Sequence, residues 1–209
     1  MIIPTELIEL INKNFRTLMG NSFHLSRSKQ DSFSYVLEGT STALNRFPND
    51  SKEVTVIKWF DKFWLYLSIK FSKNETIVNE KVKLQVNAFI SLSVFQGEDS
   101  DEKKHQLFRA ECDDYNNPDE KHAQPHWHIT SSQAIESTFE KYADDLEKQD
   151  FIELLEREKQ KVFDVKKIHF AMNADWQTNG THSHKLEDEQ QIVNWLQGML
   201  NYLRVELEN

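Results

Sequence analysis

The amino-acid sequence predicts an α+β fold in which a mostly antiparallel sheet is flanked by an N-terminal helix and C-terminal helices. Three observations support this class. Apolar residues recur at helical spacing near both ends of the chain, strict two-residue alternation marks a long central segment, and the predicted strands follow one another directly. No internal repeat or glycine- and proline-rich linker divides the chain, so one domain over residues 1–209 is expected.

The first predicted element is an amphipathic helix that begins at Pro4 and Thr5 and runs to about Gly20. Its apolar residues lie three and four positions apart: Leu7, Ile8, Ile11, Phe15 and Leu18. Residues 21–50 are rich in Ser, contain three Asn, and are harder to assign. Within them, residues 32–37 have the composition of a strand, and residues 46–51 that of a loop around Pro48.

Aromatic and β-branched residues from Val54 onwards indicate β-structure, as either two strands that turn near Asp61 and Lys62 or one long bent strand. Residues 82–94 then alternate, with apolar residues at every even position, which predicts a long strand with one buried face. A polar loop leads to residues 105–113, whose own alternation predicts an adjacent antiparallel strand.

The strand predicted over residues 105–113 has one charged face and one apolar face. Leu107, Arg109 and Glu111 occupy odd positions, whereas the even positions include the apolar residues and Cys112. Charged side chains on one face indicate an exposed surface or the lining of a site. Cys112 is expected to be buried and inert, because a thiol among apolar neighbours stays protonated.

The short segment 125–130 alternates in the same way and is also predicted to be a strand. His126 and His128 share one face, while Trp127 and Ile129 are expected to face the core. Histidines two positions apart on a strand have Cα atoms about 6.5–7 Å from each other, so their rings can converge on one ion.

The C-terminal part is predicted to contain helices around one further strand. Apolar residues recur at three and four positions over residues 135–155, residues 165–172 alternate as in a strand, and a last helix begins near Leu186. The apolar stripe of this last helix consists of Ile192, Trp195, Leu196, Met199, Leu200, Leu203 and Leu207.

Composition and charge narrow the expected partners and compartment. A net charge of −9 disfavours broad nucleic-acid binding, although residues 52–83 are comparatively basic and leave a local contact open. The single cysteine fits a reducing cytosol, and no apolar stretch approaches the roughly 20 residues that cross a bilayer. The sequence therefore predicts a cytoplasmic protein without membrane contact.

Three of the eight histidines, His122, His126 and His128, fall within seven residues, and this spacing predicts a metal site. His122 would supply a third imidazole through the loop, and Glu111 or Asp113 on the preceding strand would supply a carboxylate. The expected ion is a divalent transition metal such as zinc. The alternative is a pair of surface histidines on a half-exposed strand.

A second histidine group, His182 and His184, repeats the same spacing, and His169 lies in the strand predicted before it. Clustering of this kind in the sequence favours spatial proximity of some of these side chains in the folded protein. The loop around His182 and His184 is rich in Asn, Gly, Thr and Ser, however, where solvated histidines are also common.

The first histidine group also fits metal-free acid–base catalysis. Two imidazoles that face a phosphodiester can act as base and acid, with Arg109 stabilising the developing negative charge. Residues 128–130 (His-Ile-Thr) and 24–26 (His-Leu-Ser) each resemble the H-x-[T/S] element of the two-histidine phosphoesterases, which carry a pair of such elements in a pseudo-symmetric fold. The resemblance covers six residues, without a duplicated strand–helix pattern, and makes His24 a further candidate.

These patterns together predict a metal- or histidine-dependent hydrolase of a phosphoester or nucleic-acid-like substrate. His126 and His128 would be ligands or the acid–base pair, Glu111 and Asp113 would support them, and Arg109 would stabilise an anion. In composition, the cluster of Arg109, Glu111, Asp113 and His128 resembles the sites of small bacterial ribonucleases. Its structural alternative is cross-strand ion pairing without a function.

The competing prediction is a non-enzymatic interaction subunit of a bacterial multi-protein system. The predicted helices over 135–155 and 192–207 carry continuous apolar stripes, the chain is acidic, and no complete catalytic motif is present. Its partner would be another protein or a second copy of this chain.

Overall fold

The structure is a computed structural model that describes much of the N-terminal half of the chain and the C-terminal helix. The residues it describes are 2–19, 22–47, 50–78, 81–102, 104–113, 124–129, 152–153, 186 and 188–208. The strand predicted over 165–172 lies outside these residues, and so does the helix predicted over 135–155 apart from residues 152 and 153, which are helical.

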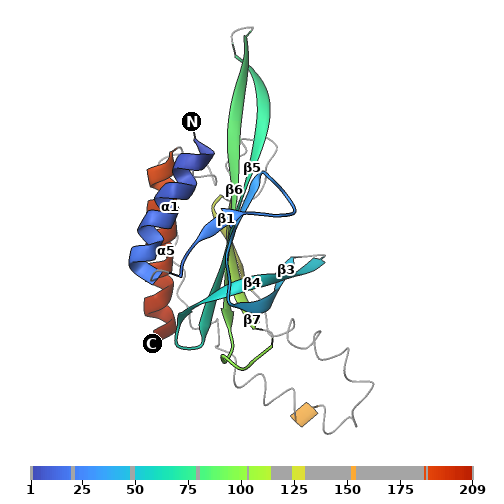
Figure 1. The fold of residues 1–209 in the computed structure, drawn as a ribbon, viewed down its shortest axis with the longest axis vertical. Helices are drawn as coiled ribbons and strands as arrows, with labels where there is room; N and C mark the ends of the chain where they lie inside the picture. The colour runs from blue at the N-terminus through green and yellow to red at the C-terminus, as the bar shows by residue number, and fades with distance from the viewer. Residues whose placement is uncertain are drawn as a thin grey trace, which may run out of the picture.

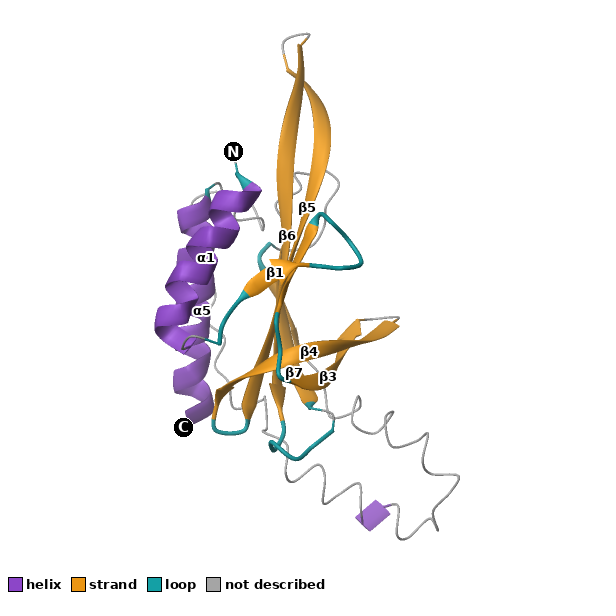
Figure 2. Ribbon diagram, in the orientation of Figure 1, coloured by secondary structure: helices purple, strands orange, loops and turns teal. Residues whose placement is uncertain are grey.

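The described elements form two layers, in which two helices cover one face of an eight-stranded sheet (Figure 1; Figure 2). The helices are α1 (Pro4–Met19) and α5 (Glu189–Glu208). The strands are β1 (Leu25–Arg27), β2 (Ser34–Leu37), β3 (Ser41–Phe47), β4 (Asp50–Phe60), β5 (Phe63–Val78), β6 (Lys81–Gln96), β7 (His105–Asp113) and β8 (His126–Ile129).

The strand order is β1-β2-β5-β6-β7-β8, with β4 also paired to β5 and β3 paired to β4. Each of these strand pairs is antiparallel. The predicted class, an α+β fold with a mostly antiparallel sheet and flanking helices, is thereby confirmed.

The two helices lie side by side and run in the same direction (Figure 1). Their starts are joined, because Ile3 N donates a hydrogen bond to Glu189 Oε1 at 2.5 Å. Burial of one large apolar side chain stabilises a protein by roughly 1.5–3 kcal/mol, so the two stripes hold the helices on the sheet. The buried residues of these stripes are Leu7, Ile8, Ile11 and Phe15 in α1, and Ile192, Val193, Leu196, Met199, Leu200, Leu203 and Leu207 in α5.

The central strands form two successive hairpins, and the first of them is one of the two alternatives that the sequence left open. β4 turns into β5 at Asp61 and Lys62, where Asp61 has a φ of 42°, a left-handed conformation that Asp tolerates better than most residues. β5 and β6 then pair along their whole length. The loop predicted over residues 46–51 is too long, because β3 extends to Phe47 and β4 begins at Asp50.

The sheet buries both of its faces around β6, and this differs from the prediction of one buried face. Ala88, Ile90, Leu92 and Val94 face the helices in the main core, together with apolar residues of β5 and β7. On the opposite face Asn87, Ser91 and Ser93 are also buried, at 3%, 2% and 0% exposure. A strand whose polar positions are this deeply buried is covered on the side that its sequence pattern marks as solvent-facing.

The β3–β4 hairpin covers part of this second face. A small apolar cluster lies beneath it: Ala43, Val54, Val56, Trp64 and Phe95. Next to this cluster Asn45 Oδ1 accepts hydrogen bonds from Ser93 Oγ at 2.9 Å and Gln106 Nε2 at 2.8 Å. β3 is therefore attached to β6 and β7 through a buried polar network as well as through apolar contact.

Two predicted side-chain directions on β7 and β8 are wrong. The pairing of β6 with β7 shifts between Val94 and Phe95, and Leu107 joins Phe108 in the main core instead of sharing the charged face. Ile129 is 49% exposed although its neighbour Trp127 packs on the core, because β8 pairs with no other described strand than β7. Cys112 is buried, as expected.

Among the described helices, none combines the length and the apolar character that a bilayer crossing requires.

Candidate metal centre

The candidate centre lies on neighbouring strands at one edge of the sheet, on the face opposite the helices. Glu111 of β7 is the register partner of His126 of β8, and Arg109 is the partner of His128. Side chains at directly opposed positions share a face and have Cβ atoms about 4.5–5.5 Å apart. The alternation of each strand therefore brings two charged side chains of β7 against two imidazoles of β8.

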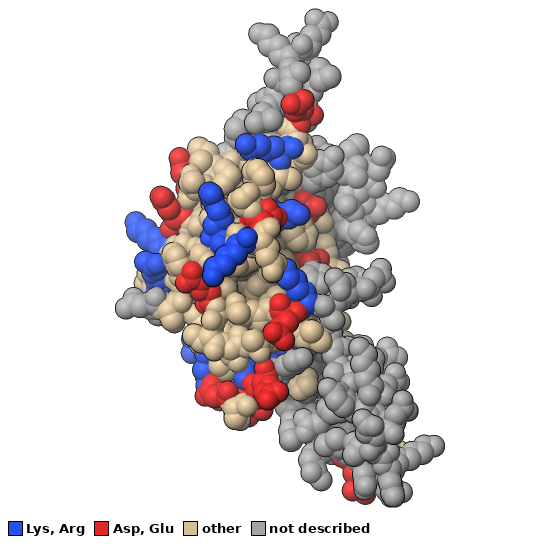
Figure 3. All heavy atoms as spheres, turned by 45° about the vertical axis from the view of Figure 1, so that its right-hand side comes forward, with Lys and Arg blue, Asp and Glu red and all other residues tan. Residues whose placement is uncertain are grey.

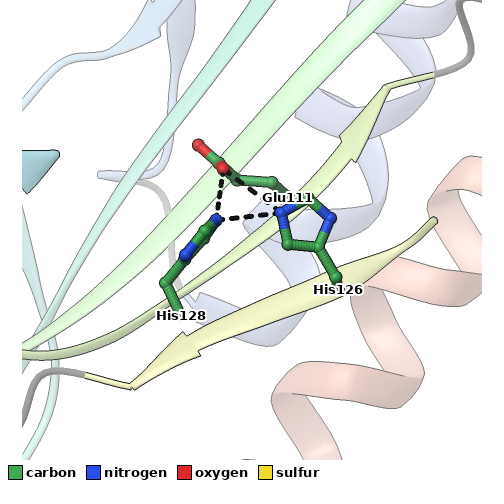
Figure 4. A group of neighbouring side chains, drawn as sticks. All are labelled: Glu111, His126 and His128. Atoms are coloured by element: carbon green, nitrogen blue, oxygen red, sulfur yellow. Dashed lines mark hydrogen bonds and ion pairs between the residues drawn. The ribbon is translucent and has the colours of Figure 1, made fainter. Parts of the chain in front are cut away.

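Glu111, His126 and His128 point their ligand atoms towards one another (Figure 4). His128 Nε2 lies 2.9 Å from Glu111 Oε2, and His126 Nε2 lies 3.6 Å from the same oxygen. The two Nε2 atoms are 2.9 Å apart. We call these three residues the Glu–His–His group.

Arg109 holds the carboxylate of this group from the other side. Its Nε lies 2.8 Å from Glu111 Oε1, so one carboxylate oxygen meets the guanidinium while Oε2 faces the histidines. The side chains of Arg109 and Glu111 are 4% and 9% exposed, whereas that of His128 is 41% exposed. The group is thus buried at Arg109 and Glu111 and open to solvent at His128.

The electrostatic environment favours an ionised carboxylate and a neutral imidazole. Burial alone would raise the pKa of Glu111, but its interaction with His126 and the positive charge of Arg109 outweigh burial and lower this pKa. The pKa of His128 is also lowered, first by burial and then by the nearby Arg109, against the opposing effect of Glu111. Both groups are therefore in the protonation state in which they bind a metal ion.

The donor set and its size fit a small transition-metal ion. Imidazole nitrogen and carboxylate oxygen bind zinc at about 2.0–2.2 Å, and ligand atoms of a tetrahedral ion then lie roughly 3.3–3.6 Å from one another. The three atoms of the Glu–His–His group, at 2.9, 2.9 and 3.6 Å, approach this triangle. An ion at about 2 Å from each of them would leave a fourth position for water or substrate.

The structure brings together part of the predicted metal site. His126, His128 and Glu111 converge, whereas Asp113 lies two residues further along β7 and is not a member of the group. The Asp113 main-chain N–H donates instead to Gln124 Oε1 at 2.9 Å. His122 lies outside the described residues, as do His169, His182 and His184.

His24 is not part of this centre. It lies directly before β1, and its Nδ1 is 3.0 Å from Arg16 Nη2. β1 and β8 are the opposite edges of the strand order, about 24 Å apart at the usual spacing of neighbouring strands. The pairing of His24 with His128 that the two-histidine phosphoesterase resemblance implies is therefore wrong.

Ser91 is a neighbour of the centre, and the sequence predicts no functional role for it. It lies on β6 as the register partner of Glu111, and its Oγ is buried without a hydrogen-bond partner among the described residues. The signal in the sequence was the alternation of β6, which already placed Ser91 on the polar face. That pattern did not show that the face is buried.

The surface of the protein carries both positive and negative side chains (Figure 3). Figure 3 shows Lys and Arg side chains beside Asp and Glu side chains over the face that it draws. Lys58, in the comparatively basic stretch 52–83, forms an ion pair with Asp99. Some of the positive charge of this stretch is thus neutralised by the loop after β6.

In the comparisons with known proteins, no protein family, curated protein or solved structure matches this chain.

Proposed function

We propose that Glu111, His126 and His128 bind one divalent transition-metal ion, zinc in the first place, and that the protein uses it to hydrolyse a phosphoester. The observation that carries this proposal is the convergence of two Nε2 atoms and one carboxylate oxygen within 2.9–3.6 Å. Two histidines and one carboxylate form a donor set of catalytic zinc sites, which keep one position open for water.

Protons alone satisfy this geometry poorly, and this supports the metal. An imidazole nitrogen carries either one proton or one lone pair in the ring plane. If both Nε2 atoms were protonated, two N–H groups would meet head to head at 2.9 Å. If only His128 Nε2 were protonated, its single proton would be shared between Glu111 and His126. A cation between them would bind all three lone pairs at once.

The surroundings of the Glu–His–His group suit hydrolysis. A metal ion with three protein ligands lowers the pKa of a bound water to about 7 and so supplies hydroxide at neutral pH. Arg109 Nη2 lies 3.4 Å from Glu111 Oε2, so a guanidinium charge lies next to the position where a phosphoryl group would gain negative charge. The exposed side of His128 leaves a route for the substrate.

Metal content is the first test of the proposal. Protein purified without a histidine tag should contain or take up one zinc ion per chain, as measured by elemental analysis and titration calorimetry. His126→Ala and His128→Ala should abolish this binding. His24→Ala is the matched control, because it removes an imidazole at the opposite edge of the sheet and should bind zinc like the wild type.

Thermal unfolding gives an independent reading of the same site. Saturation of a native-state site stabilises a protein by about 2.7 kcal/mol at a ligand concentration one hundred times Kd. Zinc should therefore raise the melting temperature of the wild type and of His24→Ala, and leave that of His128→Ala unchanged. A wild type without zinc uptake, or equal uptake by all variants, would contradict the metal site.

Hydrolysis is tested separately with a panel of 4-nitrophenyl phosphate esters. The zinc-loaded wild type should release 4-nitrophenolate, and the chelated protein and His128→Ala should not. Zinc binding without hydrolysis of any mono- or diester would leave the metal site in place and refute the phosphoesterase.

A second candidate function, binding of a protein partner, is supported by the arm that β5 and β6 form. Their far ends project beyond the helices (Figure 1), and residues 72–78 and 81–87 pair only with each other among the described strands. An isolated two-stranded hairpin is marginally stable in water, and its open edges can accept a further strand. We propose a second copy of this chain as the occupant to test first.

Shortening the arm tests this candidate without touching the Glu–His–His group. Residues 75–84 would be replaced by Asn-Gly, which joins the register partners Asn74 and Gln85 through a two-residue turn. The wild type should be a dimer by light scattering, and the shortened variant a monomer with unchanged zinc binding. A monomeric wild type would exclude the second copy.

A further inference from the structure

The face that carries the Glu–His–His group continues onto β6. Ser91 of β6, Glu111 of β7 and His126 of β8 are successive register partners and form one row across the sheet. Directly opposed Cβ atoms lie about 4.5–5.5 Å apart, so Ser91 is one strand away from the carboxylate of the group. Ser93, Arg109 and His128 form the neighbouring row.

The two serines of these rows differ in their hydrogen bonding. Ser93 is fully buried, and its Oγ donates to Asn45 Oδ1 at 2.9 Å. Ser91 is 2% exposed, and its Oγ has no partner within the part of the chain that the structure describes. A buried hydroxyl without a partner destabilises the fold, and such groups in native proteins call for an explanation such as a ligand. This one lies beside the proposed metal site.

We infer that Ser91 binds the substrate, by donating a hydrogen bond from its hydroxyl to an oxygen of the phosphoryl group that the metal ion holds. The inference rests on the proposed function. A ligand that joins a cation and a hydroxyl donor needs anionic acceptor oxygens pointing in more than one direction, and a phosphoryl group provides them. One oxygen meets the ion at Glu111, His126 and His128, and another meets Ser91 one strand away.

The test uses the cobalt(II)-loaded full-length protein and inorganic phosphate as the probe. Phosphate that enters the coordination sphere changes the visible spectrum of cobalt, so its Kd is read without any enzymatic activity. Loss of the Ser91 hydrogen bond in Ser91→Ala should weaken phosphate binding about ten-fold. The affinity for cobalt should be unchanged, and the melting temperature should stay the same or rise, because the removed hydroxyl has no partner.

Two matched variants separate this role from a structural one. Ser93→Ala removes a buried hydroxyl of the same strand and face that already has partners, so it should lower the melting temperature and leave phosphate binding unchanged. Asn87→Ala removes another buried polar group whose Oδ1 has no partner in the described structure. Asn87 lies four residues from Ser91, about 13 Å along the strand, too far for one phosphate ion to reach both.

The outcomes distinguish a failure of the metal site from a failure of the role of Ser91. Absence of cobalt binding by the wild type would refute the metal site and this inference with it. Cobalt binding without phosphate binding, or equal phosphate affinity of the wild type and Ser91→Ala, would overturn the role of Ser91 and leave the metal site intact. A ten-fold loss confined to Ser91→Ala would support it.

Discussion

Arg109 and Glu111 form a buried ion pair within a single strand. Arg109 Nε lies 2.8 Å from Glu111 Oε1, and their side chains are 4% and 9% exposed. Because the two residues are two positions apart on β7, they share a face and one oxygen of the carboxylate is fixed by the guanidinium. The other oxygen, Oε2, is left to face His126 and His128. The pair therefore sets the direction of the carboxylate.

Loss of Arg109 is expected to destabilise the protein strongly. In Arg109→Met the Glu111 carboxylate stays buried without its main cationic partner, and breaking a buried pair in this way costs about 3–5 kcal/mol. Urea unfolding at pH 7 measures the change in free energy. The control is Lys58→Met, which removes an exposed ion pair with Asp99 and should change stability by about 1 kcal/mol or less. Equal effects of the two variants would refute a structural role of the pair.

The metal-free protein should lose stability in two steps as the pH falls. The pKa of His128 in the folded state lies below its ordinary value of 6.5, so the unfolded chain binds this proton more readily. The contribution of neutral His128 to the stability of the fold is complete above about pH 6.5, and it is lost as the pH falls through the lowered pKa of His128. Glu111, also with a lowered pKa, stabilises the fold above its ordinary value of 4.5, and this part is lost as the pH falls through its folded pKa.

Urea midpoints measured from pH 8 to pH 5 in the presence of a chelator test the first step. His128→Gln cannot titrate, so its stability should fall less between pH 7 and pH 5 than that of the wild type. The same slope in both proteins would show that His128 keeps its ordinary pKa in the fold.

Asn45 is expected to be essential for the attachment of the β3–β4 hairpin. Asn45→Ala removes the acceptor of both Ser93 Oγ and Gln106 Nε2 inside the protein. Gln106 Nε2 keeps its longer hydrogen bond to Ser93 Oγ at 3.4 Å, whereas the Ser93 hydroxyl loses its acceptor. Loss of a buried hydrogen-bond partner costs about 1–3 kcal/mol, so the unfolding free energy should fall by about this amount. Asn74→Ala, at a half-buried position of β5, is the control and should have a small effect. Hydrogen exchange of β3 amides would show whether the hairpin loosens before the rest of the sheet.

The sequence predicts those parts of the fold in which the residue pattern of a single helix or strand indicates which of its faces is buried. The helical stripe of α5 and the alternation of β6 are local patterns, and they follow from one apolar side facing the core. The burial of the second face of β6 has another origin. It depends on contacts between Asn45 and residues 48 and 61 positions away, Ser93 and Gln106. No pattern within β6 contains that information.

The candidate centre likewise could be predicted only in part from local patterns. Two-residue alternation is sufficient to place His126 and His128 on one face, and to place Glu111 and Asp113 together on another strand. Which of the two carboxylates meets the histidines depends on the register between β7 and β8. The register pairs Glu111 with His126 and leaves Asp113 outside the group. The pattern alone could not separate the two acidic residues.

Two glycines are expected to respond in opposite directions to substitution by alanine. A Cβ on Gly39, between β2 and β3, would lie 2.5 Å from the carbonyl carbon of Thr55 and 2.7 Å from the carbonyl oxygen of Val56. Thr40 N donates to that same oxygen at 2.9 Å, so the two segments cannot separate without loss of a hydrogen bond. Overpacking of this kind costs about 1–3 kcal/mol.

Gly198 offers the matched case in α5, where an added Cβ would meet no atom within 4 Å. Alanine loses less backbone entropy than glycine in a helix, so Gly198→Ala should stabilise the protein by about 0.5–1 kcal/mol. Urea unfolding of both variants measures the two changes. If Gly39→Ala were as stable as the wild type, the backbone of β4 would have to lie further from Gly39 than the structure places it. The β3–β4 hairpin, and with it the cover over Ser93, would then have another position.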